Sequence, residues 1–221
     1  MWRPTISKCG FRYAAGFCAE PLPPDIGRLR SLAAFSESDV WACGDPGVLV
    51  HYTGESWQLY RKGLGNRLHQ LFGLSPRDLW VVGDSGTLLH FDGNSWQQVA
   101  GVSPAYLTGI WGPQPDDLWI VGKTYAEQGT LLHYDGQRWQ PVPSGTNQTL
   151  LTIWGARKDR IWAAGNQGTL VHYDGVAWRE VSGLNTTAKL TQVFGSDERN
   201  VWVVGHSGTA RHWDGSTFTK V

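Results

Sequence analysis

Serine, histidine and aspartate, the three residue types of a hydrolytic triad, occur close together in one short stretch of the sequence. The stretch VVGDSGTLLHFDGNSW (residues 81–96) contains Ser85 between two glycines, followed by His90 and Asp92. In a triad the serine hydroxyl attacks a carbonyl carbon, while a histidine oriented by a carboxylate takes its proton. Acyl transfer is therefore the first chemistry to test against the rest of the chain.

The same stretch recurs along the chain, usually without the serine. Residues 42–57 read ACGDPGVLVHYTGESW and residues 163–178 read AAGNQGTLVHYDGVAW. Pro46 and Gln167 stand there in the position of Ser85, whereas the flanking glycines recur. A repeat that usually lacks the nucleophile is not built around it, and no oxyanion hole is visible. Ser85 is therefore interpreted as a turn residue, and no catalytic residue is assigned.

Five units of about forty residues account for most of the sequence. Each unit begins with Leu-x-x-Φ-(Phe/Trp)-Gly, where Φ is an aliphatic residue. A polar turn follows, and then an aliphatic residue with Trp. The unit ends with Gly-Thr-Leu-Leu-His-Tyr-Asp-Gly-x-x-Trp. The units align on one tryptophan each, which is Trp41, Trp80, Trp119, Trp162 or Trp202. The intervals between these tryptophans are 39, 39, 43 and 40 residues. A period near 40 built from short β segments is typical of propeller blades. We predict an all-β, five-bladed β-propeller with four antiparallel strands per blade. The units are expected at about 28–67, 68–106, 107–149, 150–189 and 190–221.

The third unit illustrates the strands and the turn expected in every blade. Asp135-Gly136 is typical of a two-residue type I′ hairpin turn. That turn would place Leu132 opposite Trp139, and would likewise pair Leu89 with Trp96 and Val171 with Trp178. No segment longer than a turn has a 3.6-residue apolar period, so essentially no helix is expected. The four strands are predicted at 107–111, 118–122, 130–134 and 138–142.

Residues 1–27 differ from the repeated units. They are expected to form a strand-like segment and a Pro-rich connection (19–27) ahead of five whole units. Residues 2–7 resemble the fourth-strand segments that begin at Trp139 and Trp178. The segment could therefore belong to a sixth, incomplete blade, or the chain could be a fragment of a longer ring. Otherwise five units close a ring with neighbouring termini.

Composition excludes some classes of protein. Lys+Arg and Asp+Glu are both 19, a formal net charge of zero, which argues against a nucleic-acid binder dominated by charge. No window approaches 18 consecutive apolar residues, so no membrane insertion is expected. The N-terminus lacks the apolar core of an intact signal peptide. A Cys9–Cys18 bridge with a free Cys43 and three isolated buried thiols both remain open.

The histidine that recurs once per unit invites a metal or catalytic role. A small metal ion needs three or four ligands within about 2.0–2.3 Å, whereas a repeat spreads its members around a ring. We therefore expect structural histidines that donate to the backbone or to a carboxylate of a neighbouring blade, and we predict no metal and no cofactor. These histidines are His51, His90, His133, His172 and His212.

The other recurrent residues are also interpreted as structural. Second-strand tryptophans are expected in the core between blades. For the fourth-strand residues Trp57, Trp96, Trp139 and Trp178, both packing and sugar stacking stay open. The acid before the second-strand Trp is expected to cap a turn, and it is assigned to Asp39, Asp78, Asp117 and Asp159, with Asn200 in the last unit.

Functional residues are expected where the copies differ, on loops that emerge around the central channel. Loops between strands two and three contribute Asp45, Asp84, the segment 123–128 with Lys123, Tyr125, Glu127 and Gln128, Asn166, Gln167 and His206. Loops between blades contribute Lys62, Asn66, Arg67, Tyr106, Asn147, Asn185 and Thr186. This rim of amides, hydroxyls and scattered charge suits a glycan or a protein surface. The segment 123–128 is four residues longer than its counterparts and should overhang the channel mouth beside Asp84 and Asn166.

A family resemblance accompanies this pattern. The unit LLTIWGARKDRIWAAGNQGTLVHYDGVAW (150–178) resembles the WG…DvWaVG…GtllHyDGxxW repeats of bacterial propeller proteins, many of them secreted or surface-attached. The resemblance covers residues 28–221 and implies the propeller fold and an extracellular or cell-surface location. The five-fold count is similar to the architecture of tachylectin-type lectins. The Asp-Gly-x-x-Trp hairpin is similar to the structural Asp-box of sialidase-like propellers, although its spacing is one residue shorter.

These observations favour a non-catalytic binding module. Multivalent, lectin-like carbohydrate recognition through rim loops stands first, a protein-interaction scaffold second, and a propeller lyase or hydrolase third. A lectin predicts near-equivalent sites repeated around the ring, whereas a scaffold predicts one asymmetric patch. An enzyme predicts a convergent set of titratable residues in the channel. The ligand and the oligomeric state stay open.

Overall fold

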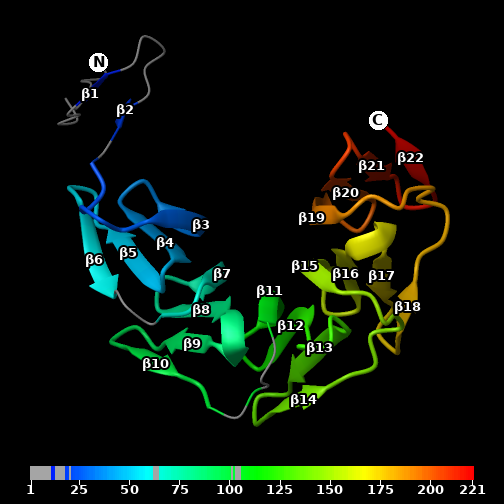
Figure 1. The fold of residues 1–221 in the computed structure, drawn as a ribbon, viewed down its shortest axis with the longest axis horizontal. Coiled ribbons are helices and arrows are strands. Elements are labelled where there is room, and N and C mark those ends of the chain that lie inside the picture. Colours follow the sequence, from blue (N-terminus) through cyan, green and yellow to red (C-terminus); the bar gives the residue numbers. More distant parts are fainter. Residues whose placement is uncertain (1–10, 13–17, 20, 62–64, 101, 103–105) are drawn as a thin grey trace, which may run out of the picture.

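The computed structural model describes residues 11–12, 18–19, 21–61, 65–100, 102 and 106–221, which form five four-stranded antiparallel sheets (Figure 1). The chain is an all-β, five-bladed β-propeller, as the repeat predicts. In the described part, the helical elements are two short 3₁₀ turns, η1 (Asp84–Gly86) and η2 (Asn166–Gly168). No helix in these ranges is long and apolar enough to cross a membrane. The predicted strand-like segment at 2–7, a Cys9–Cys18 bridge and Lys62 lie outside the described residues.

The strands follow one another in space as they do in sequence. A separate two-stranded pair, β1 (Phe11–Arg12) and β2 (Cys18–Ala19), precedes the blades. Blade 1 contains β3 (Arg28–Ser36), β4 (Asp39–Asp45), β5 (Val48–Tyr52) and β6 (Trp57–Arg61). Blade 2 contains β7 (Leu68–Ser75), β8 (Asp78–Gly83), β9 (Leu88–Phe91) and β10 (Trp96–Gln98). Blade 3 contains β11 (Tyr106–Gln114), β12 (Asp117–Lys123), β13 (Gly129–Tyr134) and β14 (Trp139–Pro141). Blade 4 contains β15 (Leu150–Arg157), β16 (Arg160–Gly165), β17 (Leu170–Tyr173) and β18 (Trp178–Glu180). Blade 5 contains β19 (Leu190–Asp197), β20 (Asn200–Gly205), β21 (Ala210–Trp213) and β22 (Phe218–Lys220).

The second-strand tryptophans pack between successive blades, as predicted. Trp119 of β12 is 4% exposed and lies against Tyr173 and Trp178 of blade 4, with ring centroids 5.0 and 5.5 Å apart. Trp41, Trp80 and Trp162 make the same kind of contact with the blade that follows each of them. The fourth-strand aromatic residue of each following blade therefore contacts the tryptophan of the preceding blade. This contact gives Trp96, Trp139 and Trp178 a packing role.

The recurrent histidine stacks on the second-strand tryptophan of its own blade. In blade 3 the His133 ring lies 4.0 Å from that of Trp119, and its Nε2 lies 2.8 Å from Asp117 Oδ1. Trp119 Nε1 donates to the same carboxylate oxygen. The expected carboxylate partner is confirmed, but it belongs to the same blade and not to a neighbour. The acid therefore holds His and Trp in place, a different role from the turn cap expected from the sequence.

Blade 4 departs from this arrangement. The residue two positions before Trp162 is Arg160, so Asp159, which the sequence predicts as the equivalent acid, is displaced by one position. Trp162 Nε1 and His172 Nε2 are buried without a hydrogen-bond partner among the described residues. Burial, together with the nearby Arg160 charge, lowers the pKa of His172 from 6.5 to about 4. His172 is therefore held neutral.

The turn between the third and fourth strands is longer than the sequence suggests. In blade 3 Tyr134 pairs with Trp139, and Leu132 pairs with Pro141, so the predicted register of Leu132 opposite Trp139 is wrong. The same correction applies to the pairs predicted for Leu89 and Val171, because Phe91 and Tyr173 face the tryptophans. Asp135 Oδ1 accepts the backbone N–H of Gln137 and Arg138, each at 2.9 Å. These bonds stabilise a four-residue loop and hold the pKa of Asp135 below its usual value.

The five blades form an open arc. The first strands of successive blades contact each other, β3 with β7, β7 with β11, β11 with β15 and β15 with β19. No comparable contact joins β19 to β3 in the described ranges, and Figure 1 shows blades 1 and 5 apart at the two ends of the arc. The expectation that five units close a ring is therefore not met. The first strands line the concave side, and the fourth strands lie outside (Figure 1).

Candidate ligand-binding site

The site is built from one irregularity that every blade repeats. In each first strand the pairing with the second strand shifts by one residue directly after the leucine of the Leu-x-x-Φ motif. A β-bulge of this kind leaves one residue out of the ladder and changes the direction of its side chain. All five bulge residues line the same pocket on the concave side of the arc. They are Arg30, His69, Thr108, Leu151 and Thr191.

The pocket has a volume of about 670 Å³ and a polar lining. The residue after each bulge contributes Ser31, Gln70, Thr152 and Gln192. The residue before each motif leucine contributes Arg67, Tyr106 and Lys189. Loops between the second and third strands add Asp84 and Lys123. Because corresponding positions carry different residues in the five blades, the pocket is one asymmetric site and not five similar ones.

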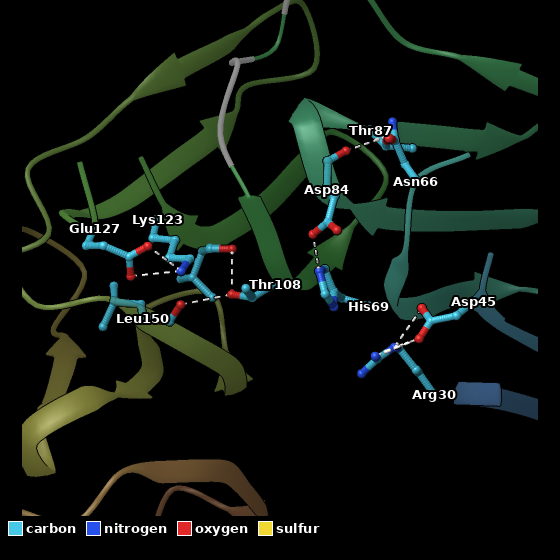
Figure 2. Close-up of polar contacts among 11 residues, drawn as sticks. Arg30, Asp45, Asn66, His69, Asp84, Thr87, Thr108, Lys123, Glu127 and Leu150 are labelled. Carbon is cyan, nitrogen blue, oxygen red and sulfur yellow. Dashed lines mark hydrogen bonds and ion pairs between the residues drawn. The ribbon is translucent and has the colours of Figure 1, made fainter. Parts of the chain in front are cut away.

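Three side chains of the pocket, Arg30, His69 and Lys123, are each held by a carboxylate within their own blade (Figure 2). Arg30 forms a two-pronged pair with Asp45, with Nε and Nη2 2.8 and 2.6 Å from the carboxylate oxygens. The Arg30 guanidinium holds the pKa of Asp45 below its usual value. His69 Nε2 lies 2.6 Å from Asp84 Oδ1, and Lys123 Nζ lies 2.6 Å from Glu127 Oε1.

Two other cations of the pocket, Arg67 and Lys189, are not held by such a partner among the described residues. Arg67 and Lys189 are exposed, and among the described residues no carboxylate forms an ion pair with either of them. With Arg30 and Lys123, they bring the lining cations to four, against the single lining carboxylate of Asp84. The pocket therefore offers two available positive charges to a ligand, although the whole chain is neutral.

The serine and threonine hydroxyl groups of the pocket form hydrogen bonds with the backbone. Thr108 Oγ1 donates to the carbonyl oxygens of Val121 and Leu150, at 3.2 and 2.9 Å. Ser31 Oγ accepts the backbone N–H of Leu71 at 3.0 Å, which ties blade 1 to blade 2. In the described ranges no hydroxyl is hydrogen-bonded to His69, and no cluster of side chains is arranged to hold a metal ion. Among the described residues that line this pocket, no nucleophile lies next to a base as acyl transfer needs.

Some residues predicted for the rim lie in or beside this pocket. Asp84, Tyr106, Lys123 and Arg67 line it, whereas Asp45 and Glu127 reach it through their ion pairs. Lys123 Nζ lies 5.1 Å from the centre of the Tyr106 ring, within cation–π range.

The remaining predicted residues have other positions. Gln167, Asn185 and Thr186 line a second hollow, formed by blade 4 and the segment that leads from it to blade 5. Asn66 donates from Nδ2 to Thr87 Oγ1. The other predicted residues make backbone hydrogen bonds within and between turns, and they are Gln128, Asn147, Asn166 and His206.

The Gly83-Asp84-Ser85-Gly86 motif forms a turn. Gly83 to Gly86 span the end of β8 and the 3₁₀ turn η1, in which Ser85 has a φ of 56°. Gln167 and Ser207 repeat this left-handed conformation, with φ of 55° and 56°. His90 Nε2 lies 2.8 Å from Asp78, so it is engaged with its own blade. Ser85 is a turn residue, as predicted.

The bulge residues were missed by reasoning from the sequence. From the sequence, functional differences between the copies are expected in loops alone. The two variable positions of the Leu-x-x-Φ motif, for example Arg30-Ser31 against Thr191-Gln192, carry the same signal inside a strand. Five copies that agree on leucine and differ directly after it indicate positions that the fold does not fix.

Comparisons with known proteins agree with the fold. No family model and no curated protein sequence matches the chain. Among solved structures, it is similar to YCF48 from Cyanidioschyzon merolae, with a TM-score of 0.62 and 15% identity over 84% of this chain and 67% of that one. The extracellular domain of the putative hybrid two component system BT3049 from B. thetaiotaomicron matches with a TM-score of 0.65 and 14% identity, over 87% of this chain and 29% of that one. The computationally designed Ika8 protein matches with a TM-score of 0.70 and 16% identity, over 94% of this chain and 64% of that one. At these identities the likeness concerns the fold.

Shortening the loop between β12 and β13 tests whether ligand binding can be weakened without loss of stability. Tyr125 at its tip is 58% exposed, and its ring lies edge-on to Tyr106, 5.3 Å away. Replacing residues 123–128 with Asp-Ser, as in blade 2, should leave the melting temperature within about 4 °C, because an exposed loop with no apolar run adds little stability. Ligand binding should weaken, since Lys123 lines the pocket. Thermal unfolding and a binding titration measure both effects. Unchanged affinity would mark the loop as a neutral insertion, and collapse of the fold would show that it is structural.

Proposed function

We propose that the protein is a non-catalytic binding module that holds an acidic protein segment in the concave pocket. The observation that carries the proposal is a single asymmetric polar pocket in which Arg67 and Lys189 have no carboxylate partner among the described residues. Carboxylates on a ligand would pair with both groups through charge-assisted hydrogen bonds. The bulges place the lining residues on strands of a packed scaffold, which favours a preformed site.

The asymmetry of the pocket favours a protein partner over a multivalent lectin. A lectin with one sugar site per blade needs the same side chains at corresponding positions. The bulge position instead carries Arg30, His69, Thr108, Leu151 and Thr191 in the five blades. Occupied hydroxyl groups and the pairing of His69 with Asp84 favour binding over a lyase or hydrolase activity.

An acidic glycan is the second candidate, favoured by one observation. Tyr125 presents an exposed ring at the side of the pocket, next to Tyr106 and Lys123. Such a ring can stack on a sugar while the cations bind a carboxylate. This version has one site per chain, in contrast to the five equivalent sites expected from the repeat count.

A titration with a glutamate-rich peptide tests the proposal. Arg67→Ala and Lys189→Ala should each weaken binding about five- to tenfold, because each removes one charge-assisted contact. Lys158→Ala, at the exposed turn between β15 and β16, is the matched control and should leave affinity unchanged. Affinity should also fall as salt is raised, because the contact is electrostatic.

Two results would contradict the proposal. One is peptide binding that the Arg67→Ala, Lys189→Ala double variant leaves intact, since the contact would then lie elsewhere. The other is failure of the peptide to bind while a neutral oligosaccharide binds with five sites per chain, which would restore the multivalent lectin. Binding of an acidic oligosaccharide at one site, sensitive to both substitutions, would select the second candidate.

A further inference from the structure

Each end of the arc presents a blade face that the inner blades keep buried. On blade 1 the side chain of Leu32 is 67% exposed, whereas its equivalent Leu71 in blade 2 is 3% exposed. On blade 5 the side chain of Phe194, the equivalent of Trp154, is 45% exposed. Residues 21–27 cover part of the blade 1 face, where Ile26 is buried with Ala42 and Val50. Leu32 lies outside that cover.

The inner interfaces share one aromatic contact between neighbouring blades, and blades 1 and 5 each contain only half of that contact. Four second-strand tryptophans lie against two aromatic residues of the next blade, for example Trp41 against Phe91 and Trp96 at 5.1 and 5.6 Å. In blade 5 Trp202 stacks on His212, and no aromatic residue of another blade contacts it in the described ranges. In blade 1 the corresponding pair, Tyr52 and Trp57, is assembled with ring centroids 5.5 Å apart, and no tryptophan of another blade contacts it among the residues that the structure describes.

A groove marks the incomplete side of blade 1. It has a volume of about 380 Å³, and its apolar walls are Leu22, Leu29, Leu32, Ala42 and Trp57. In blade 2 the positions equivalent to Leu29, Leu32 and Ala42 are Leu68, Leu71 and Val81, which pack against Trp41 and Cys43 of blade 1. The groove therefore corresponds to the surface that receives the preceding blade at the inner interfaces.

We infer that a second copy of this chain docks its blade 5 onto blade 1, head to tail, in the manner of the inner interfaces. Trp202 and Phe194 of one copy lie in the groove beside Leu32 and Trp57 of the other. The two surfaces differ, so the contact is heterologous, and it produces a ring if its rotation closes and a longer chain of copies if it does not. A second copy is the expected partner, because its blade 5 can repeat on blade 1 the type of interface that already occurs four times within the chain.

One residue of blade 1 makes this contact looser than the inner ones. At Gly155 and Gly195 a Cβ would lie 2.5 and 2.8 Å from the rings of Trp111 and Trp154 of the preceding blade. The equivalent position in blade 1 is Ala34, whose methyl group meets the incoming Phe194. Ala34→Gly should therefore tighten association about threefold or more, by removing an overpacked contact.

Sedimentation or light scattering over a concentration series tests the inference with two exposed residues that do not support the fold. The full chain should associate reversibly. Leu32→Arg and Phe194→Arg should each weaken association about tenfold or more, because each buries a guanidinium without a partner. Val176→Arg is the matched control, since Val176 is 83% exposed on the β17–β18 loop, outside both faces. An equimolar mixture of the two interface variants should form a dimer, because each retains the face that the other has lost.

The outcomes are distinguishable. A full chain that stays monomeric overturns the inference. A dimer that survives Phe194→Arg but not Leu32→Arg means that two blade 1 faces pair symmetrically, which also overturns it. Failure of the mixture to dimerise, or of Ala34→Gly to tighten association, contradicts the head-to-tail register. These readouts do not involve the concave pocket, so they are independent of the proposed ligand.

Discussion

Replacing Trp119 with alanine should destabilise the protein by about 3–5 kcal/mol, the range for deleting a large buried aromatic side chain. Trp119 is 4% exposed and fills the interface between blades 3 and 4. Its loss removes the contacts with Tyr173 and Trp178, the stacking on His133 and a hydrogen bond to Asp117. Denaturant unfolding measured by fluorescence gives the change in the free energy of unfolding.

Trp202→Ala provides the matched control for this prediction. Trp202 occupies the same position in its blade, stacks on His212 and donates to Asn200, but it has no following blade among the described residues. Measured at a dilution where the chains are separate, its substitution should cost less than half as much as that of Trp119. Equal losses for the two variants would show that packing between blades is not the main source of stability.

Arg160→Asn should stabilise the protein by about 1–2 kcal/mol at neutral pH, because it supplies an acceptor to two buried donors. In blade 5 Asn200 Oδ1 accepts Trp202 Nε1 at 3.0 Å and lies 2.8 Å from His212 Nε2. Blade 4 has Arg160 in that position, and Trp162 Nε1 and His172 Nε2 have no partner in the described part of the chain. Arg160 is partly exposed, so its bonds to the carbonyl oxygens of Asp159 and Asp174 and its ion pair with the Asp159 carboxylate contribute less than the two new bonds.

The same substitution should reduce the sensitivity of the protein to acid. Burial first, and then the Arg160 charge, lower the pKa of His172 from 6.5 to about 4. Between those values the unfolded chain binds a proton that the folded chain does not, so stability falls as the pH falls from 6.5 to 4. The loss is about 1–3 kcal/mol, since the ring is only partly buried. Arg160→Asn removes the nearby cation and gives the ring an acceptor, so the loss should shrink.

A reciprocal variant makes this prediction specific to the pair. Asn200→Arg places the arrangement of blade 4 in blade 5, and it should lower stability and add acid sensitivity in the same pH range. Urea unfolding from pH 4 to 7 measures both variants. An Arg160→Asn protein with the stability profile of the natural chain would show that His172 does not limit acid stability.

The blade count was predictable because propeller units encode their structure locally. The Gly-Thr-Leu-Leu-His-Tyr segment alternates between the two faces of a sheet, and Trp recurs with a period that fits four short strands. Closure was not predictable by the same reasoning. It depends on the rotation between neighbouring blades, which arises from packing at interfaces such as Trp119 against Trp178.

Two local errors concern the role of an aspartate side chain. The Asp-Gly dipeptide predicts a two-residue turn, but the Asp135 carboxylate accepts two backbone N–H groups and stabilises a four-residue loop. Asp159 was aligned with Asp117 although it is one position away. Asp159 lies in the turn before β16, whereas Asp117 is the first residue of β12, so Asp159 does not take the place in blade 4 that Asp117 has beside His133 in blade 3.

The site was predicted only in part, because a bulge changes the direction of a side chain without a distinct sequence signal. Lys123, Tyr106, Asp84 and Arg67 were predictable, because they fall in predicted loops where the copies differ. The bulge residues lie inside strands, where alternation predicts that they face a neighbouring blade. The extra residue after each motif leucine turns Thr191 and its equivalents toward the pocket.

The open arc also bears on how the chain reaches its structure. Hydrogen bonds between blades join residues 40 to 42 positions apart, about one repeat, as in Ser31 with Leu71 and Thr108 with Leu150. In the described part of the chain, no strand contact joins the first blade to the last. Folding therefore does not have to close a long loop between them, and that entropy cost is absent. Such a chain can gain structure progressively during synthesis, each blade docking on the one already made. For this protein, the order of translation is also an order in which it can fold.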